Sequence, residues 1–265
     1  MDNNTKKITF IVGAGAIENA WAPVLEVLRE SSNIHDLDAD GANSILARYV
    51  YLMRFYSTGT FPNANALAQE FISEIDKLKE EIANSLTNAE QNKITKARPQ
   101  LKDILYKFIF SETNECVAIT TNWDTVLDNA INSLGQINSG NDINVLHLHG
   151  DVKSSKKLYL PSEVVREPYR TKEDDLEMGQ LHGTVSRAIE ECNISILYGL
   201  SLDPLDAELG QTLAAGWSSP NLEEIIIINP THEKIAKRVK LLIDERYPVK
   251  ISGYSPDNLN TKVEY

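Results

Sequence analysis

Residues 8–16 read ITFIVGAGA, an apolar and β-branched run that ends in a glycine turn. Four further runs of this kind follow along the chain, and helix-like stretches separate most of them. They are Cys116–Thr120 (CVAIT), Asn144–Leu148 (NVLHL), Asn193–Tyr198 (NISILY) and Glu224–Ile228 (EIIII). Nearly continuous hydrophobicity is typical of strands that are covered on both faces, as in a parallel sheet. The predicted fold is therefore α/β, a Rossmann-like parallel sheet with helices on both faces.

The long interval between the first two runs has a helical pattern instead. Apolar residues recur there at spacings of three and four, namely Leu67, Phe71, Ile75, Leu78, Ile82 and Leu86. We therefore predict a helical insertion at residues 36–112, within a core formed by residues 1–35 and 113–265. The polar stretch Val152–Glu177 carries two prolines and predicts a loop with little structure, a candidate mobile lid.

Composition limits the classes of function. The 265 residues carry a formal net charge of -12, which argues against nonspecific binding to nucleic acid. No apolar run reaches the roughly 18 residues that a membrane helix needs, and the first residues, MDNNTKK, lack the apolar core of a signal peptide. Cys116 and Cys192 are isolated, so neither a disulfide framework nor a zinc site is predicted. We expect a cytoplasmic protein that binds neither nucleic acid nor a membrane.

Each of the five apolar runs ends in polar or glycine residues. In an open parallel sheet the carboxyl ends of the strands meet at one edge, where ligands bind. The five clusters at that edge are Gly13-Ala14-Gly15-Ala16, Thr121-Asn122-Trp123-Asp124, His149-Gly150-Asp151, Gly199-Leu200-Ser201-Leu202-Asp203 and Asn229-Pro230. The sequence therefore predicts a single binding site built from five strand ends.

Two of these motifs also have an interpretation without a ligand. The glycine turn lacks the third glycine of the usual dinucleotide fingerprint, because Glu18 occupies that place. A tight strand-to-helix turn would explain it equally well. Asn122 and Asp124 are residue types that cap helices, and a helix is predicted directly after them.

The histidines differ in their expected surroundings. His147 and His149 alternate along a strand, so their side chains point to opposite faces unless the strand ends between them. We predict that His147 is packed or hydrogen-bonded in the core, and that His149 lies at the edge as an acid or base. A purely structural role for His149 is the alternative. His35, His182 and His232 are predicted to be surface residues.

In combination and in order, the motifs resemble those of the sirtuin family and of its sirtuin-like relatives in bacteria. The matching series is Gly13-Ala14-Gly15, Thr120-Thr121-Asn122-Trp123-Asp124, Leu148-His149-Gly150, Gly199-Leu200-Ser201-Leu202 and Ile228-Asn229-Pro230. By this resemblance Asn122 would bind the ribose next to nicotinamide and position the attacking water. Asp124 would organise that pocket, and His149 would be the catalytic histidine. The other residues that would contact NAD⁺ are Gly13, Ala14 and Gly15 at the pyrophosphate, with Thr121, Gly199, Ser201 and Asn229.

Two departures separate the chain from deacylating sirtuins. It has no paired Cys-x-x-Cys motifs for structural zinc, and Ile17–Pro23 does not resemble the family's phosphate loop. The pattern is closer to the zinc-free sirtuin-like domains of bacterial antiphage defence, which hydrolyse NAD⁺. The resemblance therefore implies a defence effector that works as a homo-oligomer or with a partner, such as a sensor domain, an ATPase or an Argonaute-like protein.

The expected activity is cleavage of the nicotinamide–ribose bond of NAD⁺, which serves as the substrate. Three alternatives stay open: a catalytically silent domain that binds NAD⁺ or ADP-ribose, a deacylase without its zinc module, and a scaffold with a vestigial pocket. The sequence shows no clear basic cluster for a 2′-phosphate, which favours NAD⁺ over NADP⁺.

Overall fold

The structure is a computed structural model that describes residues 5–32, 34–110, 114–135, 143–244, 246 and 248–265. Within these residues, seven strands form one sheet in the order β5-β4-β1-β6-β7-β8-β9. Their bounds are β1 (Lys6–Val12), β4 (Asn114–Thr120), β5 (Val145–His147), β6 (Ile194–Tyr198), β7 (Glu224–Ile228), β8 (Lys250–Ser255) and β9 (Asn258–Glu264). All neighbours pair in parallel except β9, which runs antiparallel to β8. The predicted Rossmann-like α/β class is therefore confirmed.

All five predicted apolar runs form strands, whereas β8 and β9 were not predicted. Strand β8 reads KISGYS, so small and polar residues interrupt its apolar pattern. Its buried Ser252 is tolerated because the hydroxyl donates a hydrogen bond to Glu224 Oε1 at 2.5 Å. A polar group with a hydrogen-bond partner costs little in a buried strand. It nevertheless interrupts the apolar run by which a strand is predicted from the sequence.

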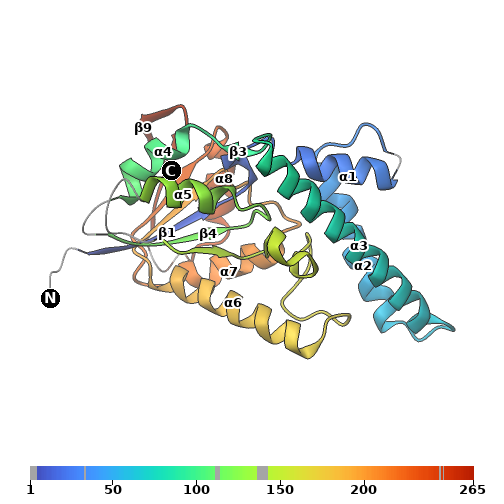
Figure 1. Ribbon diagram of the computed structural model, residues 1–265. Helices are drawn as coiled ribbons and strands as arrows, with labels where there is room; N and C mark the ends of the chain where they lie inside the picture. The colour runs from blue at the N-terminus through green and yellow to red at the C-terminus, as the bar shows by residue number, and fades with distance from the viewer. Residues whose placement is uncertain (1–4, 33, 111–113, 136–142, 245, 247) are drawn as a thin grey trace.

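Helices cover both faces of the sheet, since neighbouring residues of each strand point to opposite sides. In β1, Phe10 packs with α4 and α5, and Ile11 packs with α6, α7 and α8. The first two of these helices lie above the sheet in Figure 1, while α6 and α7 lie below it. Their bounds are α4 (Gln100–Ile104), α5 (Val126–Gly135), α6 (Lys172–Glu191), α7 (Ala207–Trp217) and α8 (His232–Lys240), with a π-helix at Leu105–Ile109 that continues α4.

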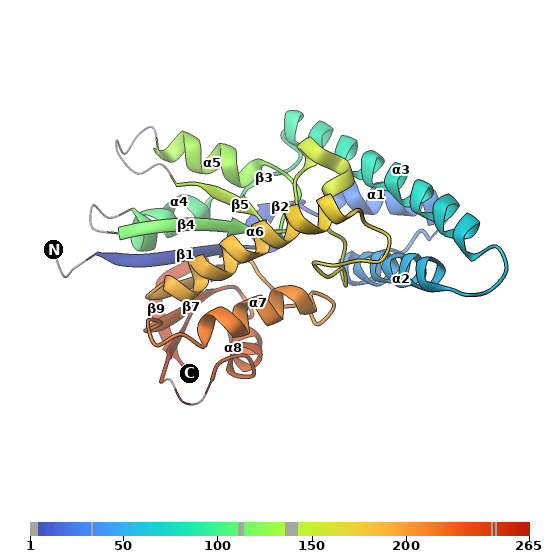
Figure 2. The same ribbon diagram turned by 90° about the horizontal axis from the view of Figure 1, so that it is seen from below.

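Three further helices form a separate cluster with its own apolar core. They are α1 (Ala22–Ser32), α2 (Ala39–Thr58) and α3 (Ala64–Gln91), and we call them the helical unit. Ile75, Leu78 and Ile82 of the predicted apolar stripe are buried in this core. Figures 1 and 2 both show the helical unit beyond the carboxyl ends of the parallel strands, with α2 and α3 side by side.

The helical unit differs in extent from the predicted insertion at residues 36–112. Helix α1 packs with α2 and α3, although the prediction placed it in the core. Residues 100–109 pack against the sheet instead. A short antiparallel ladder of β2 (Ile17–Glu18) and β3 (Lys96–Ala97) joins the segments where the chain leaves the sheet for the helical unit and returns from it. The predicted boundary at residues 112 and 113 lies outside the described residues.

The predicted loop Val152–Glu177 is only partly irregular, and its role as a lid stays a prediction. It begins with a 3₁₀ helix, Val152–Lys157, and α6 starts at Lys172. Residues 158–170, which we call the strap, have no regular structure, yet Leu158, Tyr159 and Leu160 are at most 2% exposed. Such burial fixes the strap against the rest of the protein. In the part of the chain that the structure describes, no helix is long and apolar enough to cross a membrane.

The turn after β6 can be tested at Gly199. Its φ is +63°, in the left-handed region, and a Cβ there would lie 2.2 Å from the backbone nitrogen of Ala16. We expect Gly199→Ala to lower the free energy of unfolding by at least about 2 kcal/mol, because such backbone strain costs roughly 1–3 kcal/mol and the clash adds to it. Urea denaturation would measure the change. The matched control is Gly210→Ala in α7, where a Cβ meets nothing within 4 Å and alanine favours the helix. Equal losses in the two variants would contradict this account of the turn.

Candidate active site

A cavity of about 760 Å³ lies at the carboxyl edge of the sheet, between the strand ends and the helical unit. This volume is typical of sites for small molecules and cofactors, which measure roughly 300–1,000 Å³. Of the ten residues predicted from the sequence, all but Gly13 line it: Ala14, Gly15, Thr121, Asn122, Asp124, His149, Gly199, Ser201 and Asn229. The structure therefore brings the strand-end motifs together as the topology of a parallel sheet requires.

The glycine turn is explained first by the close approach of two backbones. The Gly15 amide donates to Gly199 O at 2.8 Å, and the Gly13 amide donates to Tyr198 O at 3.0 Å. A Cβ on Gly15 would lie 2.8 Å from that same oxygen of Gly199. The turn continues into a single 3₁₀ turn and then β2, so the strand-to-helix turn given as the alternative to a ligand site is not what the structure has. The amides of Gly13 and Gly15 are already used, and the predicted pyrophosphate contact of this turn stays a prediction.

The turn after β4 is held by its own hydrogen bonds. The Asn122 amide donates to Thr120 Oγ1 at 3.1 Å, and the Val126 amide donates to Asp124 Oδ1 at 3.1 Å. Asp124 thus caps the first turn of α5, which was the structural alternative for this residue. Burial raises the pKa of the Asp124 carboxyl to about 6, because it disfavours the charged form.

The side chain of Asn122 faces the cavity in a poorly solvated position. The residue is 7% exposed, and its Nδ2 has no hydrogen-bond partner in the described part of the chain. Below it, His147 Nδ1 bonds to the Asn122 carbonyl at 3.3 Å, and His147 Nε2 bonds to Asp128 at 2.9 Å. His147 is therefore hydrogen-bonded, as predicted. Burial opposes the His147 cation, but Asp128 outweighs it, so the pKa of His147 is raised. A buried donor without a partner is costly, so the Asn122 amide is available to a ligand.

His149 lines the same cavity after the end of β5, which neighbours β4, and it has an acidic neighbour. Its side chain is 12% exposed, and Nε2 is 3.4 Å from Asp206 Oδ1. This separation allows an ion pair when the imidazole is protonated, but not a hydrogen bond, since Nε2 has no partner with hydrogen-bond geometry among the described residues. Burial disfavours the imidazolium, yet Asp206 and a hydrogen bond with the Thr121 backbone outweigh it, and the pKa of His149 is raised.

Asp206 was not among the site residues predicted from the sequence. Its Oδ1 also accepts from the Leu209 amide at 3.4 Å and caps α7. An acidic residue directly before a helical apolar run is a cap signal, so the cap was predictable. The contact with His149 was not, because it joins strand ends that are far apart in the sequence.

The loops after β6 and β7 are tied to each other. Asn229 Nδ2 donates to Leu200 O at 3.3 Å, and Asn229 Oδ1 accepts from the Thr231 amide at 2.9 Å. Ser201 is exposed and its carbonyl accepts from Arg238 at 2.7 Å. The Asn229 amide therefore shapes this rim of the cavity, and its predicted ribose contact would compete with these bonds.

Three cations that the sequence did not reveal line the cavity, namely Arg98, Lys234 and Arg238. Arg98 Nε donates to Gly15 O at 2.9 Å, which places its guanidinium above the end of β1. The other two lie one turn apart on α8, after β7. Arg238 also donates to the Ser201 and Leu202 carbonyls, so part of its guanidinium is already engaged. The preference for NAD⁺ over NADP⁺ stays a prediction.

Two histidines expected at the surface lie inside the protein. His182 is 6% exposed on α6, and burial lowers its pKa to about 4. His232 is half-buried, with Nδ1 paired to the Tyr265 hydroxyl. Both predictions are wrong because a helix that looks polar overall still buries one face. His35 is exposed, as expected.

The chain matches no model of a known protein family, and no curated protein matches it. Among the residues that the structure describes, no group of three or more His, Cys, Asp or Glu side chains is placed to hold a metal ion. The function must therefore be argued from the cavity and the groups that line it.

The pairing of His149 with Asp206 gives a prediction for its titration. We expect Asp206→Asn to lower the pKa of His149, because the carboxylate that stabilises the imidazolium is removed while asparagine can still cap α7. Two-dimensional NMR of the protein labelled with ¹⁵N-histidine would follow the titration. His147 is the internal control, since its own partner is Asp128 and its titration should not move. An unchanged His149 titration would show that the two groups do not interact.

Proposed function

We propose that this protein hydrolyses NAD⁺ at the carboxyl edge of the sheet, giving nicotinamide and ADP-ribose. The main support is the pair of buried nitrogens, Asn122 Nδ2 and His149 Nε2, that lack a hydrogen-bond partner among the described residues and belong to one cavity. Buried polar atoms are nearly always paired in proteins, so unpaired atoms that gather at one cavity, with the Tyr159 hydroxyl as a third, support a polar ligand. The ordered motifs that resemble sirtuin-like domains point to NAD⁺ as that ligand.

The distribution of charge along the cavity supports an extended substrate that has a negatively charged part and a neutral polar part. Arg98, Lys234 and Arg238 suit the negative pyrophosphate, whereas Asn122 and His149 lie where the ends of β4 and β5 meet. In this arrangement the nicotinamide ribose lies beside Asn122 and His149. Side-chain cations then supply the positive charge that the engaged amides of the glycine turn do not.

The reaction needs little acid catalysis. The bond between the ribose C1′ and the pyridinium nitrogen breaks with its electron pair going to the nitrogen, which neutralises the leaving ring. A water oxygen bonds to C1′, and one proton is released overall. Asn122 is suited to bind a ribose hydroxyl and the water through its amide, and His149 is suited to accept the proton in its neutral form.

A catalytically silent binder is the second candidate, and one observation favours it. Asp124 is occupied as a helix cap, which leaves one group fewer for catalysis. A role as an antiphage effector, acting as a homo-oligomer or with a partner such as an ATPase or Argonaute-like protein, rests on the resemblance alone and belongs to the proposal.

The activity is tested by incubating the full chain with NAD⁺ and separating nicotinamide and ADP-ribose by chromatography. We expect release by the wild type, and a loss of about a hundredfold or more in Asn122→Ala and His149→Ala. Matched controls are Asn65→Ala and His35→Ala, which replace exposed residues outside the cavity. Full activity in both site variants would refute the assigned residues. Binding of ADP-ribose in calorimetry, without any release by the wild type, would establish the silent binder instead.

The raised pKa of His149 fixes the direction of the pH dependence. A base must be neutral to accept a proton, so kcat/KM should rise with pH, with a midpoint above the ordinary value for histidine of about 6.5. Removal of the carboxylate in Asp206→Asn should move this midpoint to lower pH. A flat profile from pH 6 to 8.5 would exclude His149 as the base.

A further inference from the structure

The strap has an unusual position for a segment without helix or strand. Its first residues alternate in direction: Leu158 and Leu160 belong to the apolar core of the helical unit. Tyr159, between them, contacts His149 instead. Neighbouring side chains of an extended segment point to opposite sides. The sequence Leu-Tyr-Leu therefore contacts the helical unit through its leucines and His149 at the edge of the sheet through its tyrosine.

Tyr159 restricts His149 through both ring and backbone. The two rings are stacked, with centroids 5.4 Å apart and planes 8° apart. The Tyr159 amide donates to His149 O at 2.9 Å, and Tyr159 O accepts from Trp123 Nε1 at 3.2 Å. Offset stacking at this distance is a favourable aromatic geometry. The imidazole is therefore held with Nε2 towards Asp206.

The Tyr159 ring is in turn held by two further side chains that contact it, Arg170 and His182. The guanidinium of Arg170 lies 5.0 Å from the ring centroid, which is a cation–π distance. The ring of His182 lies 5.4 Å away in a tilted arrangement. Arg170 is itself paired with the buried Glu163 at 2.8 Å. The Tyr159 hydroxyl has no hydrogen-bond partner among the described residues, so the ring and not the hydroxyl makes these contacts.

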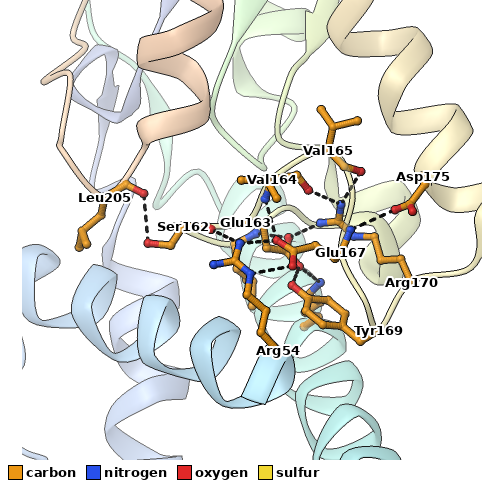
Figure 3. A network of polar contacts seen from close by, with 12 residues as sticks. Arg54, Ser162, Glu163, Val164, Val165, Glu167, Tyr169, Arg170, Asp175 and Leu205 are labelled. Atoms are coloured by element: carbon orange, nitrogen blue, oxygen red, sulfur yellow. Dashed lines mark hydrogen bonds and ion pairs between the residues drawn. The ribbon is translucent and has the colours of Figure 1, made fainter. Parts of the chain in front are cut away.

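Two buried carboxylates connect the strap to the helical unit, and Figure 3 shows the connection between Glu167 and Arg54. Glu167 accepts two bonds from Arg54 of α2, one of them from Nε at 2.7 Å. Arg54 also donates to Ser162 O at 2.5 Å. Glu163 lies 3.8 Å from Lys79 of α3, and its side chain, like that of Glu167, is fully buried. A buried charge that loses its partner is strongly destabilising, so these ion pairs fix the position of the strap relative to the helical unit.

We propose that Tyr159 is a positioning residue for His149, and that the helical unit holds the strap, and with it Tyr159, in place through the contacts of Arg54 with Glu167 and of Lys79 with Glu163. The catalytic part of this inference rests on the proposed hydrolysis of NAD⁺, whereas the structural part does not. The orientation of the helical unit is thereby coupled to the imidazole across the strap. The charged groups around that imidazole are Asp206 before α7, Glu163 of the strap and, when protonated, His182 of α6.

The test compares four variants of the full chain. Tyr159→Leu removes the ring, and Tyr159→Phe removes only the unpartnered hydroxyl. Glu167→Gln weakens the tie to α2 but keeps an acceptor for the Val164 amide. Glu191→Gln is the matched control, because this glutamate is also ion-paired, to Lys7, but is half exposed and distant from the strap.

We expect NMR of ¹⁵N-labelled histidine to show a broadened or split imidazole signal for His149 in Tyr159→Leu and Glu167→Gln, because the ring then adopts more than one orientation. A freed imidazole leaves both Asp206 and its buried site, and because the raising effect of Asp206 is the larger of the two, its pKa should fall towards the ordinary value. The kcat for nicotinamide release should fall about tenfold or more with KM nearly unchanged, since misplacement of a catalytic group affects the chemical step. Tyr159→Phe and Glu191→Gln should match the wild type.

A wild-type His149 titration in folded Tyr159→Leu and Glu167→Gln would overturn the inference, as would equal effects of Tyr159→Phe and Tyr159→Leu. If Tyr159→Leu fails to fold, Glu167→Gln against Glu191→Gln still decides the coupling. If the wild type releases no nicotinamide, the proposed function fails, and the NMR titration alone decides whether Tyr159 positions His149.

Discussion

The backbone contact between the turns after β1 and β6 is the constraint on which the carboxyl edge depends. The Gly15 amide donates to Gly199 O, and neither residue has room for a Cβ. After this contact the chain does not continue over the sheet as a helix. It leaves sideways through β2, builds the helical unit, and returns through β3 to Arg98, whose amide donates to Ala16 O. The cavity is the space that this excursion leaves above the strand ends.

The parts of the fold that sequence analysis predicted are those set by local patterns. Continuous apolar runs marked five strands, and a parallel sheet places all their ends at one edge, so the cavity lining followed. The interrupted strand β8 was missed because Ser252 satisfies its polar group through Glu224, a contact invisible in the sequence. Asp206 and Tyr159 were missed as neighbours of His149 for the same reason. The glycines were recognised, but a sequence cannot distinguish a glycine needed by a ligand from one needed by a neighbouring backbone.

The strap shows how an irregular segment can be buried without secondary structure. Its amides need acceptors once they leave water, and two carboxylates supply them. The Leu160 amide donates to Glu163 at 2.7 Å, and the Val164 amide donates to Glu167 at 2.7 Å. The negative charges that this introduces are matched by Arg54 and Arg170. A segment that reads as a polar loop in the sequence is therefore a packed connection between two apolar cores.

The cluster around Tyr159 separates the titration of two histidines that share one aromatic neighbour. His149 faces Asp206, which raises its pKa against the opposing effect of burial. His182 is buried, and Asp206 raises its pKa too weakly to offset that burial, so its pKa falls to about 4. Protonation of His149 further disfavours protonation of His182. Both imidazoles contact the Tyr159 ring, so their two positive charges would lie close together and repel. Near neutral pH the cluster therefore has a single histidine that can gain or lose a proton, and it is the one at the cavity. Pairs of groups whose surroundings drive their pKa values apart are a usual property of sites that move protons.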